Sequence, residues 1–193
     1  MSGGRKPGAG RIRIIGGNLR NSRLQVPELP GLRPTPERVR ETLFNWLAPV
    51  IEGSRCLDLC AGTGALGIEA CSRGAARVQF VERDAGALQA LRENLVRLKV
   101  EVGQVALLDA GRFLQGTAQP YDLVFLDPPF ALDLWPALAR QLEHGGWLAS
   151  KALIYVESPS DVVPELPASW QLHREARAGD VRFALYRRAL PLS

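Results

Sequence analysis

From Arg55 to Glu157, short apolar runs alternate regularly with longer segments of helical spacing. The runs predict five buried strands, at Cys56–Cys60, Arg77–Glu82, Val100–Leu108, Tyr121–Leu126 and Ala152–Glu157. The segments between them predict helices at Ala65–Arg73, Ala85–Lys99 and Leu132–Leu142, with a short helical turn before Leu114. Alternation of this kind builds a parallel sheet covered by helices on both faces. We therefore expect an α/β, Rossmann-like fold with its ligands at the carboxyl edge of the sheet.

The C-terminal region departs from this alternation. Two runs of period two, Trp170–Glu175 and Val181–Arg187, flank Ala178-Gly179-Asp180 and predict an antiparallel hairpin. A mostly parallel seven-stranded sheet that ends in such a hairpin resembles the class I S-adenosylmethionine-dependent methyltransferases. Dehydrogenases that bind dinucleotides usually lack this hairpin.

The first fifty residues form a different kind of segment. Residues 1–10 are rich in glycine and predict a mobile tail. Arg11–Ile15 and Leu24–Val26, with Gly16-Gly17-Asn18 between them, predict a small β-hairpin. We expect residues 11–50 to be an N-terminal extension and residues 51–193 to be the main α/β domain.

A helix is expected after the proline-rich connector that follows this hairpin. Thr35 is a good N-cap and Pro36 suits the first helical position. Apolar side chains then recur at helical spacing, at Val39, Leu43, Trp46 and Leu47. Arg38 and Arg40 are expected to lie off this apolar face.

Composition limits the classes of function. The chain has 193 residues, enough for one α/β domain with a small addition. It contains neither an apolar run of about 18 residues nor a signal-peptide pattern, so we expect a cytoplasmic protein without a membrane segment. The spacing of Cys56, Cys60 and Cys71 matches no zinc pattern, and core thiols are expected in place of metal ligands.

Positive charge is concentrated at one end of the chain. Residues 1–40 carry nine lysines and arginines against two glutamates, a net charge of +7, whereas the remaining 153 residues carry −3. This asymmetry indicates a polyanionic partner that is contacted through the N-terminal segment. The alternative is that these arginines only keep the segment soluble. The candidate RNA-binding residues are Arg11, Arg13, Arg20, Arg23, Arg33 and Arg38.

A glycine-rich turn follows the first predicted strand of the sheet. Gly62-Thr63-Gly64-Ala65-Leu66-Gly67 fits G-x-G-x-x-G between a strand and a helix, the context in which the pattern is meaningful. Glu82 ends the next strand, where an acidic side chain can accept from both hydroxyl groups of a ribose. These two features alone do not distinguish NAD from other adenosine cofactors.

Further acidic residues favour S-adenosylmethionine as the cofactor. Asp58 precedes the glycines in the D-x-x-x-G-x-G form typical of methyltransferases, and Asp109 ends the third strand, where it can accept from an adenine amino group. The candidate cofactor-binding residues are therefore Asp58, Ala61, Gly62, Gly64, Gly67, Glu82 and Asp109.

The fourth strand of the sheet ends at Asp127-Pro128-Pro129-Phe130, our four candidate catalytic residues. An exocyclic base amine is a poor nucleophile, because its lone pair is conjugated into the ring. Asp127 and the carbonyl of Pro128 can accept its two N–H groups, and Phe130 can stack on the base. Taken alone, the motif is also compatible with a simple turn that ends a strand.

With these residues in place, the sequence resembles the RsmD family, bacterial enzymes that methylate N2 of one guanine in 16S ribosomal RNA. The resemblance covers nearly the whole chain after the tail. Its segments are Arg13–Gly17, Gly31–Thr35, Arg38–Leu47, Ala61–Gly67, Ser72–Ala75, Asp127–Phe130 and Tyr155–Glu157. Cys60 stands where the family pattern leads us to expect Phe.

The resemblance implies a substrate of assembled or assembling 30S subunits, and not free RNA. We expect a monomeric enzyme that needs no metal, with residues 11–50 as its N-terminal RNA-binding extension and residues 51–193 as its methyltransferase domain. Two alternatives stay open at this point. One is another amino-methyltransferase of the same motif class, with DNA or protein as substrate. The other is a non-catalytic ribosome assembly factor that binds the cofactor without transferring a methyl group.

Overall fold

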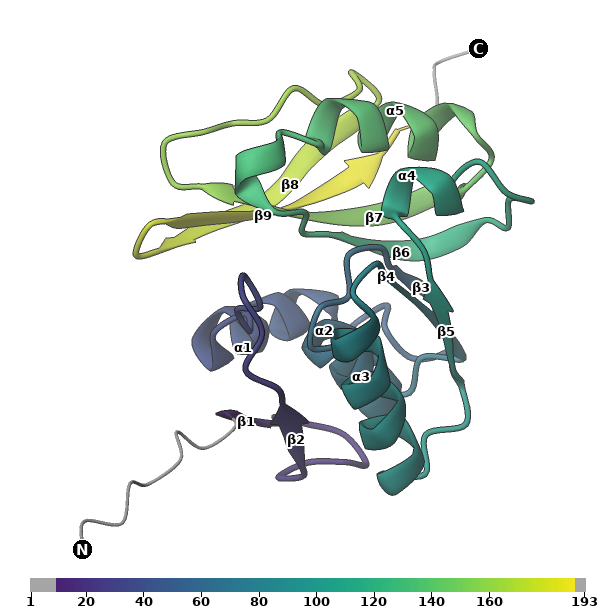
Figure 1. Cartoon of the computed structure of the whole chain (residues 1–193). Coiled ribbons are helices and arrows are strands. Elements are labelled where there is room, and N and C mark those ends of the chain that lie inside the picture. Colours follow the sequence, from purple (N-terminus) through teal and green to yellow (C-terminus); the bar gives the residue numbers. More distant parts are fainter. Residues whose placement is uncertain (1–9, 190–193) are drawn as a thin grey trace, which may run out of the picture.

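The computed structural model describes residues 10–189, in which seven strands form one sheet of order β5-β4-β3-β6-β7-β9-β8 (Figure 1). Strands β3 to β7 are parallel, and β9 pairs antiparallel with both β7 and β8. This confirms the expected mostly parallel sheet with a C-terminal hairpin. The strands are β3 (Arg55–Asp58), β4 (Arg77–Glu82), β5 (Gly103–Leu107), β6 (Tyr121–Leu126), β7 (Leu148–Pro159), β8 (Trp170–Ala178) and β9 (Val181–Arg188).

The order of the strands fixes where a ligand can bind. The chain leaves β3 towards β4 on one side, whereas β6 pairs with the other side of β3. The strand order therefore reverses at β3, and the carboxyl ends around it border the crevice in which open α/β sheets bind their ligands.

Helices cover both faces of the sheet, as Figure 1 shows. On one face lie α1 (Glu37–Leu47), α2 (Ala65–Ser72) and α3 (Ala85–Arg97); on the other lie α4 (Ala110–Phe113) and α5 (Trp135–His144). Strand β6 is apolar at successive positions because Leu123 and Phe125 pack towards the first layer, and Val124 and Leu126 towards the second.

The N-terminal hairpin packs into the same core as the sheet. Strands β1 (Gly10–Arg13) and β2 (Arg23–Val26) are antiparallel, and Ile12 lies opposite Leu24 in the core cluster that also contains Phe80 and Leu91. The expected hairpin is therefore confirmed. Within the described residues it is fixed to the first helical layer by apolar burial.

Several expected boundaries were wrong. Gly10 belongs to β1 and not to the tail, and residues 1–9 lie outside the described range. Helix α5 begins at Trp135, because Phe130–Leu132 first form a 3-10 turn. Strand β7 extends well beyond the expected run, and β5 is shorter than expected.

The expected start of the first helix was also wrong. Pro36 occupies the N-cap position of α1, and no side-chain hydrogen bond caps the helix. The carbonyl of Thr35 accepts a hydrogen bond from Arg40 Nε at 3.1 Å. Thr35 is thus held as part of the connector by a residue one turn into α1.

The expected exposure of Arg40 was wrong for a related reason. Its side chain is 2% exposed and lies 3.5 Å from the fully buried carboxylate of Glu69. Glu69 also accepts from the backbone N–H groups of Ile15 and Gly16, at 3.0 and 2.9 Å. Arg40 donates in turn to the carbonyl of Arg13 at 3.0 Å. This buried network joins the hairpin, α1 and α2, so Arg40 is not available to a partner.

Candidate active site

A pocket of about 690 Å³ opens at the carboxyl ends of the parallel strands. One wall is formed by residues at or after the ends of β3, β4, β5 and β6, together with Glu157 of β7. The opposite wall is the connector 29–36, which joins the N-terminal hairpin to α1. The predicted site residues that line the pocket are Glu82, Asp109, Asp127, Pro128, Pro129, Phe130 and Arg33.

The glycine turn lies behind the β3–β4 part of this wall. Gly64 has φ 77°, and a Cβ atom at this position would stand 2.3 Å from Leu91 Cδ1. A Cβ at Gly67 would stand 2.2 Å from Phe80 Cε1. Both positions therefore require glycine, which lets α2 pack closely against β4 and α3. Ala61 continues the turn, since its N–H donates to Val81 O at 2.9 Å.

Glu82 is held at the mouth of the glycine turn by two backbone groups. Its Oε2 accepts from Gly62 N at 2.7 Å, and its Oε1 accepts from Asp84 N at 3.0 Å. A carboxylate oxygen has room for more than one hydrogen bond. Glu82 is thus oriented by the backbone and retains acceptor capacity towards the pocket.

Asp58, the last residue of β3, holds the glycine turn through a hydrogen bond. It is buried and accepts a hydrogen bond from Gly67 N at 3.0 Å. Burial raises the pKa of Asp58 from 3.8 to about 7; the Gly67 bond opposes this shift and the nearby charge of Glu82 adds to it. Asp58 joins β3 to α2 and does not itself line the pocket.

Asp109 lies on the pocket wall and also caps a helix. Its Oδ1 accepts from Gly111 N at 2.9 Å and from Arg112 N at 3.3 Å, which fixes the start of α4. The side chain is exposed on the side of the pocket formed by β4 and β5.

The Asp127–Phe130 motif borders the other end of the pocket. Asp127 directly follows β6, and Pro129 starts the 3-10 turn that carries Phe130. The Phe130 ring is 36% exposed and lies 5.8 Å from the ring of Trp135, measured between centroids. The motif therefore presents a carboxyl group and an aromatic ring from a rigid turn.

The carboxyl groups of Asp127 and Glu157 lie side by side. The parallel register pairs Phe125 with Tyr155 and Leu126 with Val156, so Asp127 and Glu157 follow as the next neighbours. Burial and then the charge of Glu157 raise the pKa of Asp127 well above its ordinary value. Burial also raises the pKa of Glu157, while Tyr155, Asp127 and Thr35 oppose this shift.

Comparison with known proteins places the chain among relatives that match it nearly end to end. Residues 12–187 match the family described as Conserved hypothetical protein 95. Ribosomal RNA small subunit methyltransferase D of Escherichia coli (strain K12) is 52% identical over 182 residues, which cover 94% of this chain and 92% of that protein. The protein of the same name from Haemophilus influenzae is 44% identical, with 92% and 94% covered. The chain belongs to the RsmD family.

A solved structure supports the same grouping. The methyltransferase yhhF from Escherichia coli is 48% identical and superposes with a TM-score of 0.87, over 94% of this chain and 99% of that one. The expected resemblance to the RsmD family and the class I methyltransferase fold are both confirmed. The individual site residues stay predictions.

Within this member of the RsmD family, the six candidate RNA-binding arginines differ in their surroundings. Arg11, Arg20, Arg23, Arg33 and Arg38 are exposed. Arg13 is ion-paired with Glu37 and also donates to Asn21 Oδ1 at 3.0 Å. The hairpin register places Arg13 opposite Arg23 and Arg11 opposite Gln25, on the face away from the core. Arg11, Arg13 and Arg23 therefore share the outer face of the hairpin, and Arg13 is already paired with Glu37.

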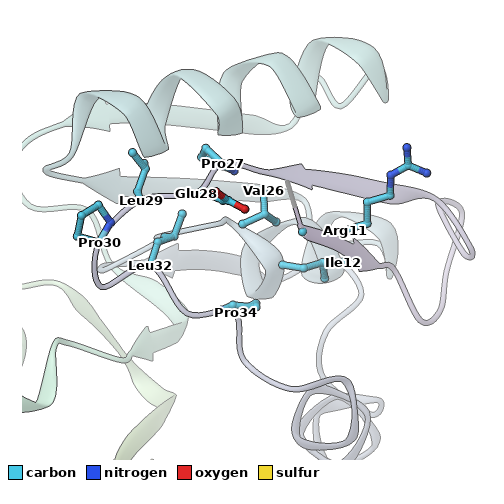
Figure 2. Close-up of a pocket in the computed structure, with 10 residues that line it drawn as sticks. Arg11, Ile12, Val26, Pro27, Glu28, Leu29, Pro30, Leu32 and Pro34 are labelled. Carbon is cyan, nitrogen blue, oxygen red and sulfur yellow. The ribbon is translucent and has the colours of Figure 1, made fainter. Parts of the chain in front are cut away.

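A second hollow, of about 490 Å³, lies on the outer side of the connector (Figure 2). Its walls come from both strands of the hairpin and from the connector, and Leu29, Pro30, Leu32 and Pro34 also line the main pocket. Figure 2 shows the guanidinium group of Arg11 pointing away from the other lining side chains. The connector is thus a thin wall between two concave surfaces.

Two functional features were missed in the sequence. Glu157 was treated as the end of a strand and as part of the family resemblance, with no role of its own. The register signal was present, because Glu157 follows Val156 on β7 as Asp127 follows Leu126, its partner on β6. The connector was treated as irregular chain, yet its prolines and Gly31 form a wall of the pocket. Within residues 10–189, no helix is long and apolar enough to cross a bilayer, and no cluster of three or more His, Cys, Asp or Glu could hold a metal ion.

Proposed function

We propose that this protein transfers a methyl group from S-adenosylmethionine to the exocyclic N2 of a guanine in 16S rRNA, within assembled or assembling 30S subunits. The observation that carries the proposal is a single pocket with Glu82 at one end and the Asp127–Phe130 motif at the other. The names of its RsmD-family relatives, ribosomal RNA small subunit methyltransferases, support the class of substrate.

The chemistry of the pocket fits this cofactor. Glu82 offers acceptor oxygens to a ribose diol, and the exposed Asp109 can accept from an adenine amino group. The apolar side chains of Leu29 and Leu32 line the same region and can cover the adenosine. When bound, S-adenosylmethionine supplies an electrophilic methyl group on its sulfonium.

The residues of the motif then position the amine. Asp127 and the carbonyl of Pro128 accept its two N–H groups, which disfavours conjugation of the lone pair into the ring. Phe130 stacks on the extruded base, because its ring is partly exposed at the mouth of the pocket. Positioning of this kind, together with aligned acceptors, supplies most of the rate enhancement.

The exposed arginines of the N-terminal extension supply the contact with RNA phosphates. Arg11, Arg20, Arg23 and Arg38 are exposed on elements that flank the connector, and Arg33 lies on the connector itself. Unpaired RNA segments carry one negative charge per phosphate, so this segment attracts them while the acidic remainder of the chain does not. We keep the expectation that the protein acts as a monomer in the cytoplasm.

The proposal is tested by incubating the protein with methyl-labelled S-adenosylmethionine and 30S subunits from cells that lack this modification. Digestion of the RNA to nucleosides should yield N2-methylguanosine, and mapping of the label along the 16S rRNA should place it at one site. The Asp127→Ala variant is the matched control and should give only background. Label in DNA or protein would favour another amino-methyltransferase. Cofactor binding without transfer to any substrate would favour an assembly factor, and either result would overturn the proposal.

A further inference from the structure

The negative charge beside the catalytic motif is better stabilised on Glu157 than on Asp127. The Tyr155 hydroxyl donates to Glu157 Oε1 at 2.5 Å. The Thr35 hydroxyl, on the connector, also favours the charged form of Glu157. Among the described residues, the neighbours that act on Asp127 are instead carboxyl groups, namely Glu157 and Asp58. Glu157 therefore has hydrogen-bond donors as neighbours, whereas the neighbours of Asp127 are other carboxyl groups.

This difference fixes the direction of the hydrogen bond between the two groups. Two ionised carboxylates that lie side by side repel, so such a pair retains one proton. The proton is more stable on Asp127, which has no donors of its own among the described residues. It then points at Glu157, which already accepts from Tyr155. Asp127 is thus the donor to Glu157, and its second oxygen faces the pocket as a neutral acceptor.

The backbone around Glu157 holds this arrangement rigidly. The Trp135 indole N–H donates to the carbonyl of Glu157 at 2.9 Å, which ties β7 to α5 beside the motif. Tyr155 is fully buried between Phe125 and the first helical layer. Two arginines lie on the elements beside Glu157. Phe183 of β9 pairs with Glu157, and its neighbour Arg182 is ion-paired with Glu175. Arg33, on the connector, is exposed at the pocket wall.

We propose that Glu157 is a positioning residue for methyl transfer, which holds Asp127 as a neutral hydrogen-bond donor and receives its proton as the amine is methylated. This inference rests on the proposed function. The nitrogen lone pair forms the new N–C bond, and the C–S bond breaks with its electron pair left on sulfur. One N–H proton moves to the free oxygen of Asp127, and the proton on its other oxygen moves to Glu157. The neutral pair then loses one proton to water through the open pocket.

The distribution of charge can be tested in the free protein, without substrate. Carboxyl groups labelled with ¹³C report ionisation residue by residue, and Asp127→Asn and Glu157→Gln identify the two signals. We expect the Glu157 signal to titrate at a lower pH than the Asp127 signal. Ionisation of Asp127 before Glu157 would overturn the inference. This outcome does not depend on whether the RNA substrate has been assigned correctly.

The kinetic test uses Glu157→Gln, which keeps the size of the side chain and removes the proton acceptor. We expect kcat on 30S subunits to fall by about 10²-fold, the scale of a lost general base, with cofactor affinity unchanged. The exposed Glu165→Gln is the matched control and should behave as the parent. A Glu157→Gln enzyme with the parent's kcat and pH profile would overturn the inference.

A second variant separates this role from simple support of the fold. Tyr155→Phe removes one donor to Glu157 and raises its pKa further, so the acid limb of the kcat profile should move to higher pH. In Glu157→Gln the same limb should be lost or move to lower pH. A purely structural role predicts no opposed shifts. If the parent transfers no methyl group to 30S subunits, the proposed function fails, and the titration of the free protein still decides the inference.

Discussion

A pair of acidic side chains lies at or behind each end of the pocket, but the two pairs have different partners. At the glycine-loop end, Asp58 and Glu82 each accept from backbone N–H groups of the turn. At the Asp127 end, Asp127 and Glu157 face each other. Backbone donors fix a carboxyl oxygen as an acceptor, whereas two facing carboxyl groups share a proton. In the proposed enzyme, Glu82 therefore holds the cofactor at one end, and the Asp127–Glu157 pair handles a proton at the other.

The largest expected effect comes from the Asp127 end. Asp127→Ala removes the acceptor for the amine, so kcat should fall by about 10²- to 10³-fold, the scale of one lost transition-state hydrogen bond. Cofactor affinity, measured by calorimetry, should stay close to that of the parent, because this end does not hold the ribose. Near-normal turnover would remove the distinction between the two ends.

The glycine-loop end should give the opposite result. Glu82→Ala should weaken S-adenosylmethionine binding by about 1 to 3 kcal/mol, because the ribose hydroxyls lose a charged partner. At saturating cofactor, kcat should change little. Glu101→Ala, at an exposed glutamate after α3, provides the control for a lost negative charge. Unchanged calorimetric affinity in Glu82→Ala would mean that the cofactor lies elsewhere in the pocket.

Much of this difference between the two ends of the pocket was predictable from the sequence, because it depends on local signals. The strand Arg77–Glu82 was predicted with the bounds that the structure has, and the glycine turn was placed between β3 and α2. Glu82 and Asp127 followed from their positions at strand ends. The hydrophobic period and the turn residues determine these features within a few residues of sequence.

The missed features depend on contacts between distant parts of the chain. Arg40 looked solvent-exposed because its partner, Glu69, lies 29 residues away and becomes its neighbour only when α1 packs on α2. Thr35 looked like an N-cap from its local sequence, whereas its side chain lies beside Glu157 on β7. A propensity describes the residue and its sequence neighbours, whereas burial and pairing depend on the tertiary contacts.

Asp58 offers a test of intermediate size, through the stability of the fold. Its folded pKa of about 7 lies above the unfolded value of about 3.9. Its contribution to stability is therefore complete below pH 4 and is lost as the pH rises towards 7. The free energy of unfolding of the parent relative to Asp58→Asn should fall by up to about 1.4 kcal/mol per pH unit across this interval. Urea titrations of both proteins from pH 4 to pH 8 measure the difference, and a flat difference would contradict the assigned burial.

The smallest expected effects lie outside both ends of the pocket, on the hairpin. If RNA phosphates are bound there, Arg11→Ala and Arg23→Ala should each reduce the slope of log affinity against log salt by roughly 0.7 to 0.9. Arg13 is a built-in comparison on the same face, because it is already ion-paired with Glu37. A phosphate would have to compete with this carboxylate, so Arg13→Ala should change the slope by less than about half as much. Cofactor affinity should be unchanged in all three variants, since none of the three residues lines the main pocket.

Equal slopes in the parent and the variants would mean that the arginines only keep the hairpin soluble. Weaker binding with an unchanged slope would instead indicate stacking of arginine planes on bases. Affinities for 30S subunits across a salt series distinguish these outcomes.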